Sequence, residues 1–141
     1  MFEKILVGLD GSEGSWHAFE AALRISTLER APEIWAVSVE ERLPHMPELI
    51  DELEEEKERA NAIFEKLHER AAAIAREAGV EIKTSKIIGH AAQGLIRFAE
   101  EGHFDLIVLG HSGVSGVWGR FLGGTADKIV RHAACAVLVV R

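Results

Sequence analysis

The segment from residue 110 to residue 125 is rich in the residue type that lets a backbone approach a ligand closely. It holds six of the thirteen glycines of the chain. Glycine carries no Cβ and adopts positive φ at little cost, so successive N–H groups can face an anion. A helix that begins near Gly124 adds the positive end of its dipole. Phosphate groups are therefore the expected guest, and the alternative is a flexible turn without a ligand.

The spacing of the glycines separates the known kinds of phosphate loop. A dinucleotide fingerprint needs G-x-G-x-x-G, whereas the glycines that follow the first apolar run stand three apart, at Gly8, Gly11 and Gly14. Gly119 and Gly124 have the separation of a P-loop, but Thr125 stands where that loop requires lysine. The P-loop is therefore rejected. The pattern that remains is G-x2-G-x9-G, formed by Gly110, Gly113 and Gly123.

Three side chains near these glycines could act on a phosphate. The carboxylate of Asp10, which follows the first apolar run, would repel a triphosphate unless Mg²⁺ or Mn²⁺ lies between them. Asp10 also suits a turn or a helix cap, and both roles can coexist. Arg120 is either a phosphate partner or a surface arginine. His111 is either a general base or a polar loop residue.

The elements that must position these residues are strands alternating with helices. Short apolar runs predict strands over 3–9, 33–39, 80–88, 105–109 and 136–140. Helical spacing of apolar residues predicts helices over 14–30, 48–78, 91–101 and 125–132, with a candidate break in the acidic first part of the second. This alternation is typical of a parallel sheet covered on both faces, within one domain over 1–141.

The expected sheet is doubly wound, with the strand order 3-2-1-4-5. Ligands of such sheets bind beyond the carboxyl ends of the strands, at the switch point. In this order the switch point lies between the first and fourth strands, which end at Asp10 and Gly110. Topology and sequence therefore predict the same site.

Composition and charge exclude several other functions. The net charge is −7, and residues 48–58 hold seven acids and one base, a local balance of −6. We expect a solvated acidic helix face there, and a basic footprint for nucleic acid is absent. No apolar run of the sequence, Cys135–Val140 included, is long enough to cross a membrane. The histidines and cysteine lack zinc-site spacing, and Ser12 lacks the G-x-S-x-G surroundings of a nucleophile.

The chain has a single cysteine, Cys135, which cannot form an internal disulfide. This fits a reducing compartment. The first residues, Met1 to Ile5, enter a strand pattern at once and show no signal-peptide pattern. We therefore expect a cytoplasmic protein.

With its glycine spacing, the sequence resembles the universal stress protein family along the whole chain. Residues 5–13, ILVGLDGSE, resemble the first strand and turn of that family. Residues 105–110, DLIVLG, resemble its fourth strand, and residues 126–140 resemble its closing helix and strand. The resemblance implies a Rossmann-like domain with a role in the stress response. It also implies binding of ATP or AMP, which the subset of members with the G-x2-G-x9-G spacing shows.

The resemblance implies which residues meet the nucleotide. The glycine loop would wrap the phosphates and ribose, the acid after the first strand would hold Mg²⁺ or Mn²⁺ when ATP is bound, and adenine would lie at the strand ends. Asp10 is thus the expected metal ligand. Together with the candidates above, the expected nucleotide-binding residues are Leu9, Asp10, Ser38, Leu109, Gly110, Gly113, Arg120, Gly123, Gly124 and Thr125.

This chain departs from the family's usual pattern at a few of these positions. The family commonly has serine or threonine directly after the last glycine, where this chain has Gly124, with Thr125 one residue further on. Proline is frequent in the family where Gly8 stands, and Ser38 replaces a hydrophobic residue. These differences bear on affinity more than on the position of the site.

Three functions are compatible with the sequence. The favoured one is a regulatory module whose nucleotide occupancy signals energy state. The alternatives are an interaction protein of the same fold with an empty site, or an enzyme that hydrolyses ATP at most slowly, far below about 10 s⁻¹. The last strand, over 136–140, is apolar on both faces and lies at a sheet edge. The resemblance implies a homodimer paired through it.

Overall fold

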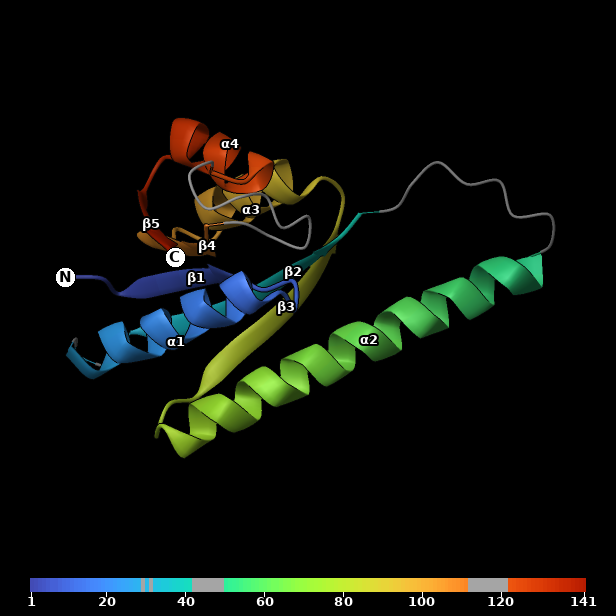
Figure 1. Ribbon diagram of the computed structural model, residues 1–141, viewed down its shortest axis with the longest axis horizontal. Helices are drawn as coiled ribbons and strands as arrows, with labels where there is room; N and C mark the ends of the chain where they lie inside the picture. The colour runs from blue at the N-terminus through green and yellow to red at the C-terminus, as the bar shows by residue number, and fades with distance from the viewer. Residues whose placement is uncertain (29, 31, 42–49, 112–121) are drawn as a thin grey trace.

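The computed structural model describes residues 1–28, 30, 32–41, 50–111 and 122–141, and strands alternate with helices along them. The elements are β1 (Lys4–Gly8), α1 (Glu13–Leu28), β2 (Glu33–Glu40), α2 (Ile50–Glu77), β3 (Ile82–Ile88), α3 (Ala91–Glu101), β4 (Leu106–Gly110), α4 (Gly124–His132) and β5 (Ala136–Val140). Each bound lies within two residues of the one predicted from the sequence. The predicted order of elements is confirmed (Figure 1).

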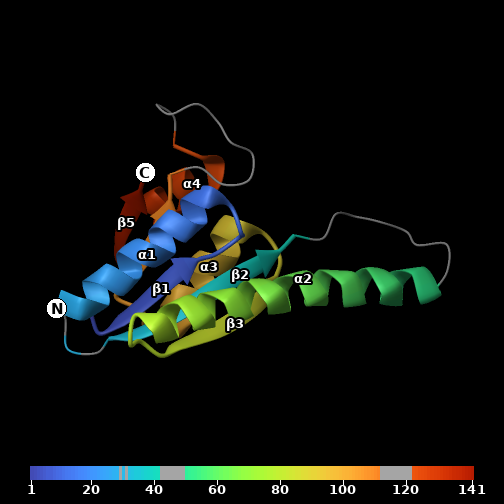
Figure 2. The ribbon, with the colours of Figure 1, turned by 60° about the horizontal axis from the view of Figure 1, so that its bottom comes forward.

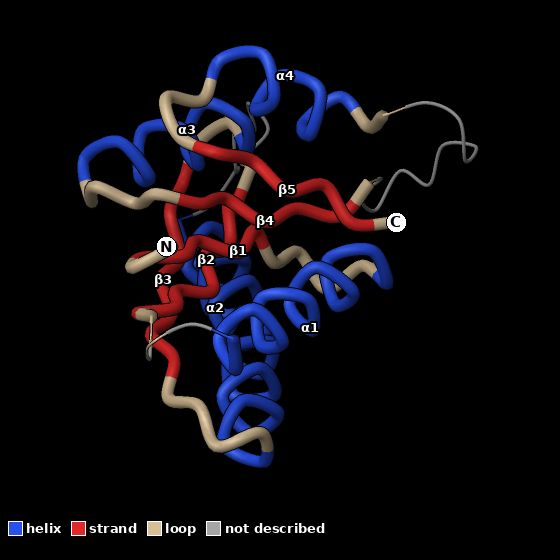
Figure 3. The backbone as a smooth tube through the Cα atoms, turned by 90° about the vertical axis from the view of Figure 1, so that its left-hand side faces the viewer, coloured by secondary structure: helices blue, strands red, loops and turns tan. Residues whose placement is uncertain are grey.

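The described strands form one parallel sheet of five, in the order β3-β2-β1-β4-β5. The predicted topology is therefore confirmed. Figure 3 shows α1 and α2 on one face of the sheet and α3 and α4 on the other. β1 lies at the centre, between β2 and β4, so the carboxyl ends of these three strands meet at one edge of the sheet.

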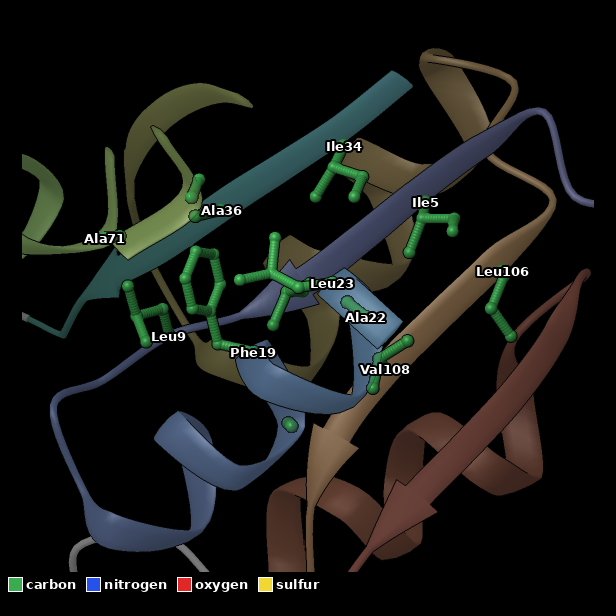
Figure 4. Packing of buried hydrophobic residues seen from close by; sticks show 13 residues of the cluster. Ile5, Leu9, Phe19, Ala22, Leu23, Ile34, Ala36, Ala71, Leu106 and Val108 are labelled. Atoms are coloured by element: carbon green, nitrogen blue, oxygen red, sulfur yellow. The ribbon is translucent and has the colours of Figure 1, made fainter. Parts of the chain in front are cut away.

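Successive side chains of β1 point alternately into the two hydrophobic cores on the opposite faces of the sheet. Ile5 and Val7 belong to the cluster under α1 and α2, whereas Leu6 belongs to the cluster under α3 and α4. All three are fully buried, because a parallel sheet covered on both faces needs apolar residues on both sides of its strands. Figure 4 shows the first cluster, in which the ring of Phe19 from α1 lies beside Leu9 of the β1 end.

The helix α2 is continuous over 28 residues, and the break suggested by its acidic start is absent from the described residues. At about 1.5 Å per residue it is about 42 Å long, whereas the eight residues of β2 span about 26 Å. Its first turns therefore extend beyond the sheet (Figure 2). Gly79, with φ +77°, ends the helix as predicted. Among the described residues, no helix combines the length and apolar character needed to span a membrane.

Candidate functional site

A cavity of about 440 Å³ opens at the carboxyl edge of the sheet. After β1 the chain turns to α1 on one face, and after β4 it continues to α4 on the other, so this edge is the switch point of the fold. The described residues that line the cavity are Gly8, Leu9, Asp10, Ser12, Ser15, Val37, Val39, Glu41, Phe64, Ala91, Leu95, Leu109, Gly110, His111, Gly123, Gly124, Thr125 and Ala126.

Seven of the ten predicted nucleotide-binding residues line this cavity. They are Leu9, Asp10, Leu109, Gly110, Gly123, Gly124 and Thr125. Ser38 is described but is not among the lining residues. Gly113 and Arg120 lie outside the described residues.

The turn after β1 is held by its own side chains. The carboxylate of Asp10 accepts a hydrogen bond from the N–H of Ser12 at 2.8 Å, and Gly11 between them has φ +86°. The hydroxyl of Ser12 accepts a hydrogen bond from the N–H of Ser15 at 3.2 Å, which caps α1. Asp10 is exposed at the cavity mouth. The turn role expected for Asp10 is therefore present, and its carboxylate still lines the cavity.

The loop after β4 is closed at its base by backbone hydrogen bonds. The N–H of His111 donates to the carbonyl of Val140 at 2.7 Å, and the carbonyl of His111 accepts from the N–H of Gly123 at 2.9 Å. Both ends of the glycine segment are thus fixed at the carboxyl edge of the sheet, and His111 lines the cavity.

The N-terminus of α4 borders the cavity. Gly123 is its N-cap, with φ −58° and ψ 153°, and Gly124, Thr125 and Ala126 of the first turn line the cavity. Because glycine has no side chain, it cannot accept the hydrogen bonds that a serine or aspartate cap takes from these N–H groups. The first turn of α4 therefore offers donors and the positive end of a helix dipole to an anion.

Gly110 has a packing role that the glycine pattern did not reveal. A Cβ on Gly110 would lie 2.5 Å from the carbonyl carbon and 2.6 Å from the carbonyl oxygen of Gly14. β4 therefore ends against the backbone of α1's first turn, and a glycine is needed there whether or not a ligand binds. Gly124, in contrast, has no described atom within 4 Å of an added Cβ.

The geometry of β2 directs the Ser38 side chain away from the cavity. The Ser38 side chain is 1% exposed, donates a hydrogen bond to the carbonyl of Leu9 at 2.6 Å and lies 2.8 Å from Nε2 of His68 on α2. Neighbouring side chains of a strand point to opposite faces. Ser38 thus faces α2, and the neighbours Val37 and Val39 line the cavity instead.

The tautomer of His68 follows from its contact with Ser38. Since the Ser38 hydroxyl donates its proton to Leu9, its oxygen accepts a hydrogen bond from the protonated Nε2 of His68. Burial lowers the pKa of His68 below the ordinary value of 6.5, so the ring is neutral near pH 7. His68 thereby connects α2 to the end of β1, directly before Asp10. No sequence motif marks this residue.

The end of the cavity over β2 contains residues that the sequence analysis did not single out as site residues. Val39, Phe64 and Leu95 give it an apolar lining. Glu41 follows β2, and its carboxylate accepts a hydrogen bond from the N–H of Ala91, the first residue of α3, at 2.9 Å. In the sequence Phe64 was one of the apolar positions of a helix, and nothing local distinguished it from core residues.

The sheet order and the helices on both faces define a Rossmann-like fold, with a cavity at its switch point. Within that class, the chain belongs to the universal stress protein family, whose model matches residues 1–141. It is 33% identical over 148 residues to universal stress protein MJ0531 of Methanocaldococcus jannaschii, covering 100% of this chain and 83% of that protein. The family predicted from the sequence is thus confirmed.

Solved structures of the family have the same fold. Universal stress protein UspA from Lactobacillus plantarum has a TM-score of 0.83 and 26% identity, covering 99% of this chain and 98% of that chain. A universal stress protein in complex with cAMP has a TM-score of 0.69 and 25% identity, covering 99% of this chain and 97% of that chain. Nucleotide binding therefore occurs within the family.

Proposed function

We propose that this protein is a cytoplasmic regulatory module of the stress response that binds an adenine nucleotide, ATP or AMP, in the cavity at the carboxyl edge. The observation that carries the proposal is that one cavity joins the glycine-capped N-terminus of α4 to an apolar recess over β2. The first end suits phosphate groups and the second suits an aromatic base. The related protein in complex with cAMP supports an adenine nucleotide as the ligand.

The strand order indicates where the phosphate end and the base end of the nucleotide would lie. β4 and β2 lie on opposite sides of β1, so the first turn of α4 and the end of β2 bound the cavity from different sides. A nucleotide with its phosphates at Gly123, Gly124 and Thr125 would reach across the end of β1 and bring its base to Val37 and Val39. Gly113 and Arg120 remain proposed contacts of the phosphates.

We propose that a divalent ion accompanies ATP and is held by Asp10. The described residues contain no group of three or more histidine, cysteine or acidic residues that could hold a metal on their own. The exposed carboxylate of Asp10 at the cavity fits Mg²⁺, which is commonly bound by one or two carboxylates and takes its other oxygens from phosphates and water. The ion would neutralise the repulsion between Asp10 and the phosphates.

Mass spectrometry of the small molecules released from purified, denatured protein tests this function. We expect ATP or AMP in an amount that approaches one per chain, or full occupancy after incubation with MgATP. Protein that carries no nucleotide and takes up none would contradict the proposal. The interaction protein with an empty site would then be the better account.

We also propose that two copies pair through β5 into a homodimer. β5 hydrogen-bonds only to β4 among the described strands, so its other edge offers unpaired backbone groups. Leu138 at this edge is 38% exposed, and no charged side chain interrupts the strand. An apolar edge of this kind favours pairing with an identical strand across a two-fold axis.

A further inference from the structure

Phe64 differs from the apolar residues of α2 that pack in the core. Leu67, Ala71, Ile74 and Ala75 of the same helix belong to or pack against the core under α1 and α2. Phe64 belongs to neither of the core clusters of the described residues, yet it is half-buried and lines the cavity. Its burial therefore comes from the carboxyl edge of the sheet and not from the core.

A half-buried lysine, Lys86, connects this part of α2 to the sheet. Lys86 of β3 donates a hydrogen bond to the Asn61 side chain on α2 at 2.5 Å and pairs with Glu40 of β2 at 3.1 Å. The side chains of Lys86 and Glu40 are only 22% and 12% exposed. The Lys86 ammonium lies 5.6 Å from the centre of the Phe64 ring, within the range of a cation–π contact.

The spacing of Asn61 and Phe64 along α2 shows how Lys86 positions the Phe64 ring. Asn61 lies three residues before Phe64, so the two side chains are neighbours on one face of the helix. By holding Asn61 and touching the ring of Phe64, Lys86 fixes the turn of α2 from which Phe64 reaches the cavity.

We propose that Phe64 forms the stacking wall of the base-binding end of the cavity, that is, the aromatic face on which the base lies. Lys86 is the positioning residue that holds the Phe64 ring there, through its contacts with Asn61 and Glu40. The inference rests on the proposed nucleotide function and deepens it. An aromatic ring stacks on the face of any base. Phe64 therefore contributes affinity for a nucleobase, while Val39 and Leu95 complete the apolar recess.

Isothermal titration with MgATP tests the stacking role. Phe64→Ala should weaken binding by about 5- to 150-fold, the range that alanine substitution of base-stacking aromatic residues produces. Phe64→Leu keeps an apolar side chain without the aromatic face and should also weaken binding. Phe64→Tyr should retain most of the affinity. The matched control is Ile63→Ala, because Ile63 precedes Phe64 on α2, is 66% exposed and is not among the residues that line the cavity.

A double-mutant cycle tests the positioning role. Lys86→Met keeps the length of the side chain but loses the cation, and it should weaken MgATP binding by itself. In the Phe64→Ala background the same change should have little further effect, because the ring that Lys86 positions is gone. A Lys86→Met effect of equal size in both backgrounds would overturn the positioning role.

The outcomes separate this inference from the proposed function. If the native protein binds MgATP and both Phe64→Ala and Phe64→Leu bind it equally well, the stacking wall is wrong and the nucleotide function stands. If the native protein binds neither ATP nor AMP, the proposed function is wrong and the stacking wall is wrong with it. Thermal melting without ligand shows that each variant is folded.

Discussion

The close approach of β4 to the backbone of Gly14 requires a residue without a side chain at position 110. Gly110→Ala places a methyl carbon 2.5 Å from the Gly14 backbone, so β4 and the first turn of α1 must move apart. We expect a loss of about 1–3 kcal/mol in the free energy of unfolding, the usual cost of overpacking. Urea denaturation measures it. Gly124→Ala is the control, since no described atom lies within 4 Å of its added Cβ; equal stability of the two variants would contradict the contact.

His68 gives the stability a specific pH dependence. Burial lowers its pKa in the folded state below the ordinary 6.5, so the unfolded chain binds the proton more readily. The stability contributed by neutral His68 is therefore complete above about pH 6.5 and is lost as the pH falls through the folded-state pKa. His68→Gln keeps an N–H donor for Ser38 and does not titrate.

Urea denaturation at about pH 7.5 and about pH 5 measures this effect, with the ordinary histidine pKa between the two. The difference in unfolding free energy between the native chain and His68→Gln should be more favourable to the native chain at the higher pH. Other groups titrate alike in both proteins and cancel. Parallel pH profiles for the two proteins would show that His68 carries no such linkage.

Individual site residues could be predicted only where the signal is local. Asp10 could be predicted because it directly follows an apolar run, and Gly123 because it belongs to the G-x2-G-x9-G spacing. Ser38 was expected at the cavity but is not among its lining residues, because the apolar run of β2 does not show which of its two faces meets the cavity. Phe64 and His68 were missed because their partners, Lys86 and Ser38, lie on other elements and only the folded chain brings them together.

At the scale of elements, α2 is held unevenly along its length. From Asp51 to Asn61 only Leu53 and Ala60 are even half-buried, whereas Ala71 and Ala75 near the other end are fully buried. Few buried contacts mean a low free energy of local opening. We therefore expect the amides of residues 54–60 to exchange hydrogen much faster than those of residues 71–77, as measured by native-state exchange. Uniform protection along α2 would contradict this prediction.

The elements themselves were largely predictable. β1 and β4 are continuous apolar runs because both of their faces are covered, and such runs are visible in the sequence. The continuity of α2 was less visible, because residues 54–59 contain no apolar residue and the first turns of the helix lie beyond the sheet. In the structure, the hydrogen bond between Asn61 and Lys86 connects the end of this part of the helix to β3.

At the scale of the whole molecule, the exposed edge of β5 predicts the oligomeric state. We expect static light scattering to give twice the chain mass of 15.5 kDa. Leu138→Lys puts a charge on the pairing edge at a side chain that is 38% exposed, so it should reduce the mass to that of one chain while leaving the fold intact. Ile88→Lys is the control, since Ile88 is 55% exposed on β3 at the opposite edge. A Leu138→Lys dimer would contradict pairing through β5.

The central claim is that an adenine nucleotide binds at the carboxyl edge with its phosphates against the glycine cap of α4. A ligand at about a hundredfold excess over its Kd stabilises the folded state by about 2.7 kcal/mol, which raises the Tm of a domain this size by roughly 5–10 °C. Valine can adopt the φ of −58° and ψ of 153° at Gly123, so Gly123→Val should fold while its side chain fills the space of the phosphates.

Thermal melting with and without millimolar MgATP is the most direct measurement of that claim. We predict a rise in Tm for the native chain and little or none for Gly123→Val or Gly113→Val, once each variant is shown to melt cooperatively without ligand. A native chain whose Tm does not respond would contradict nucleotide binding. A rise that survives both valine substitutions would place the nucleotide elsewhere on the molecule.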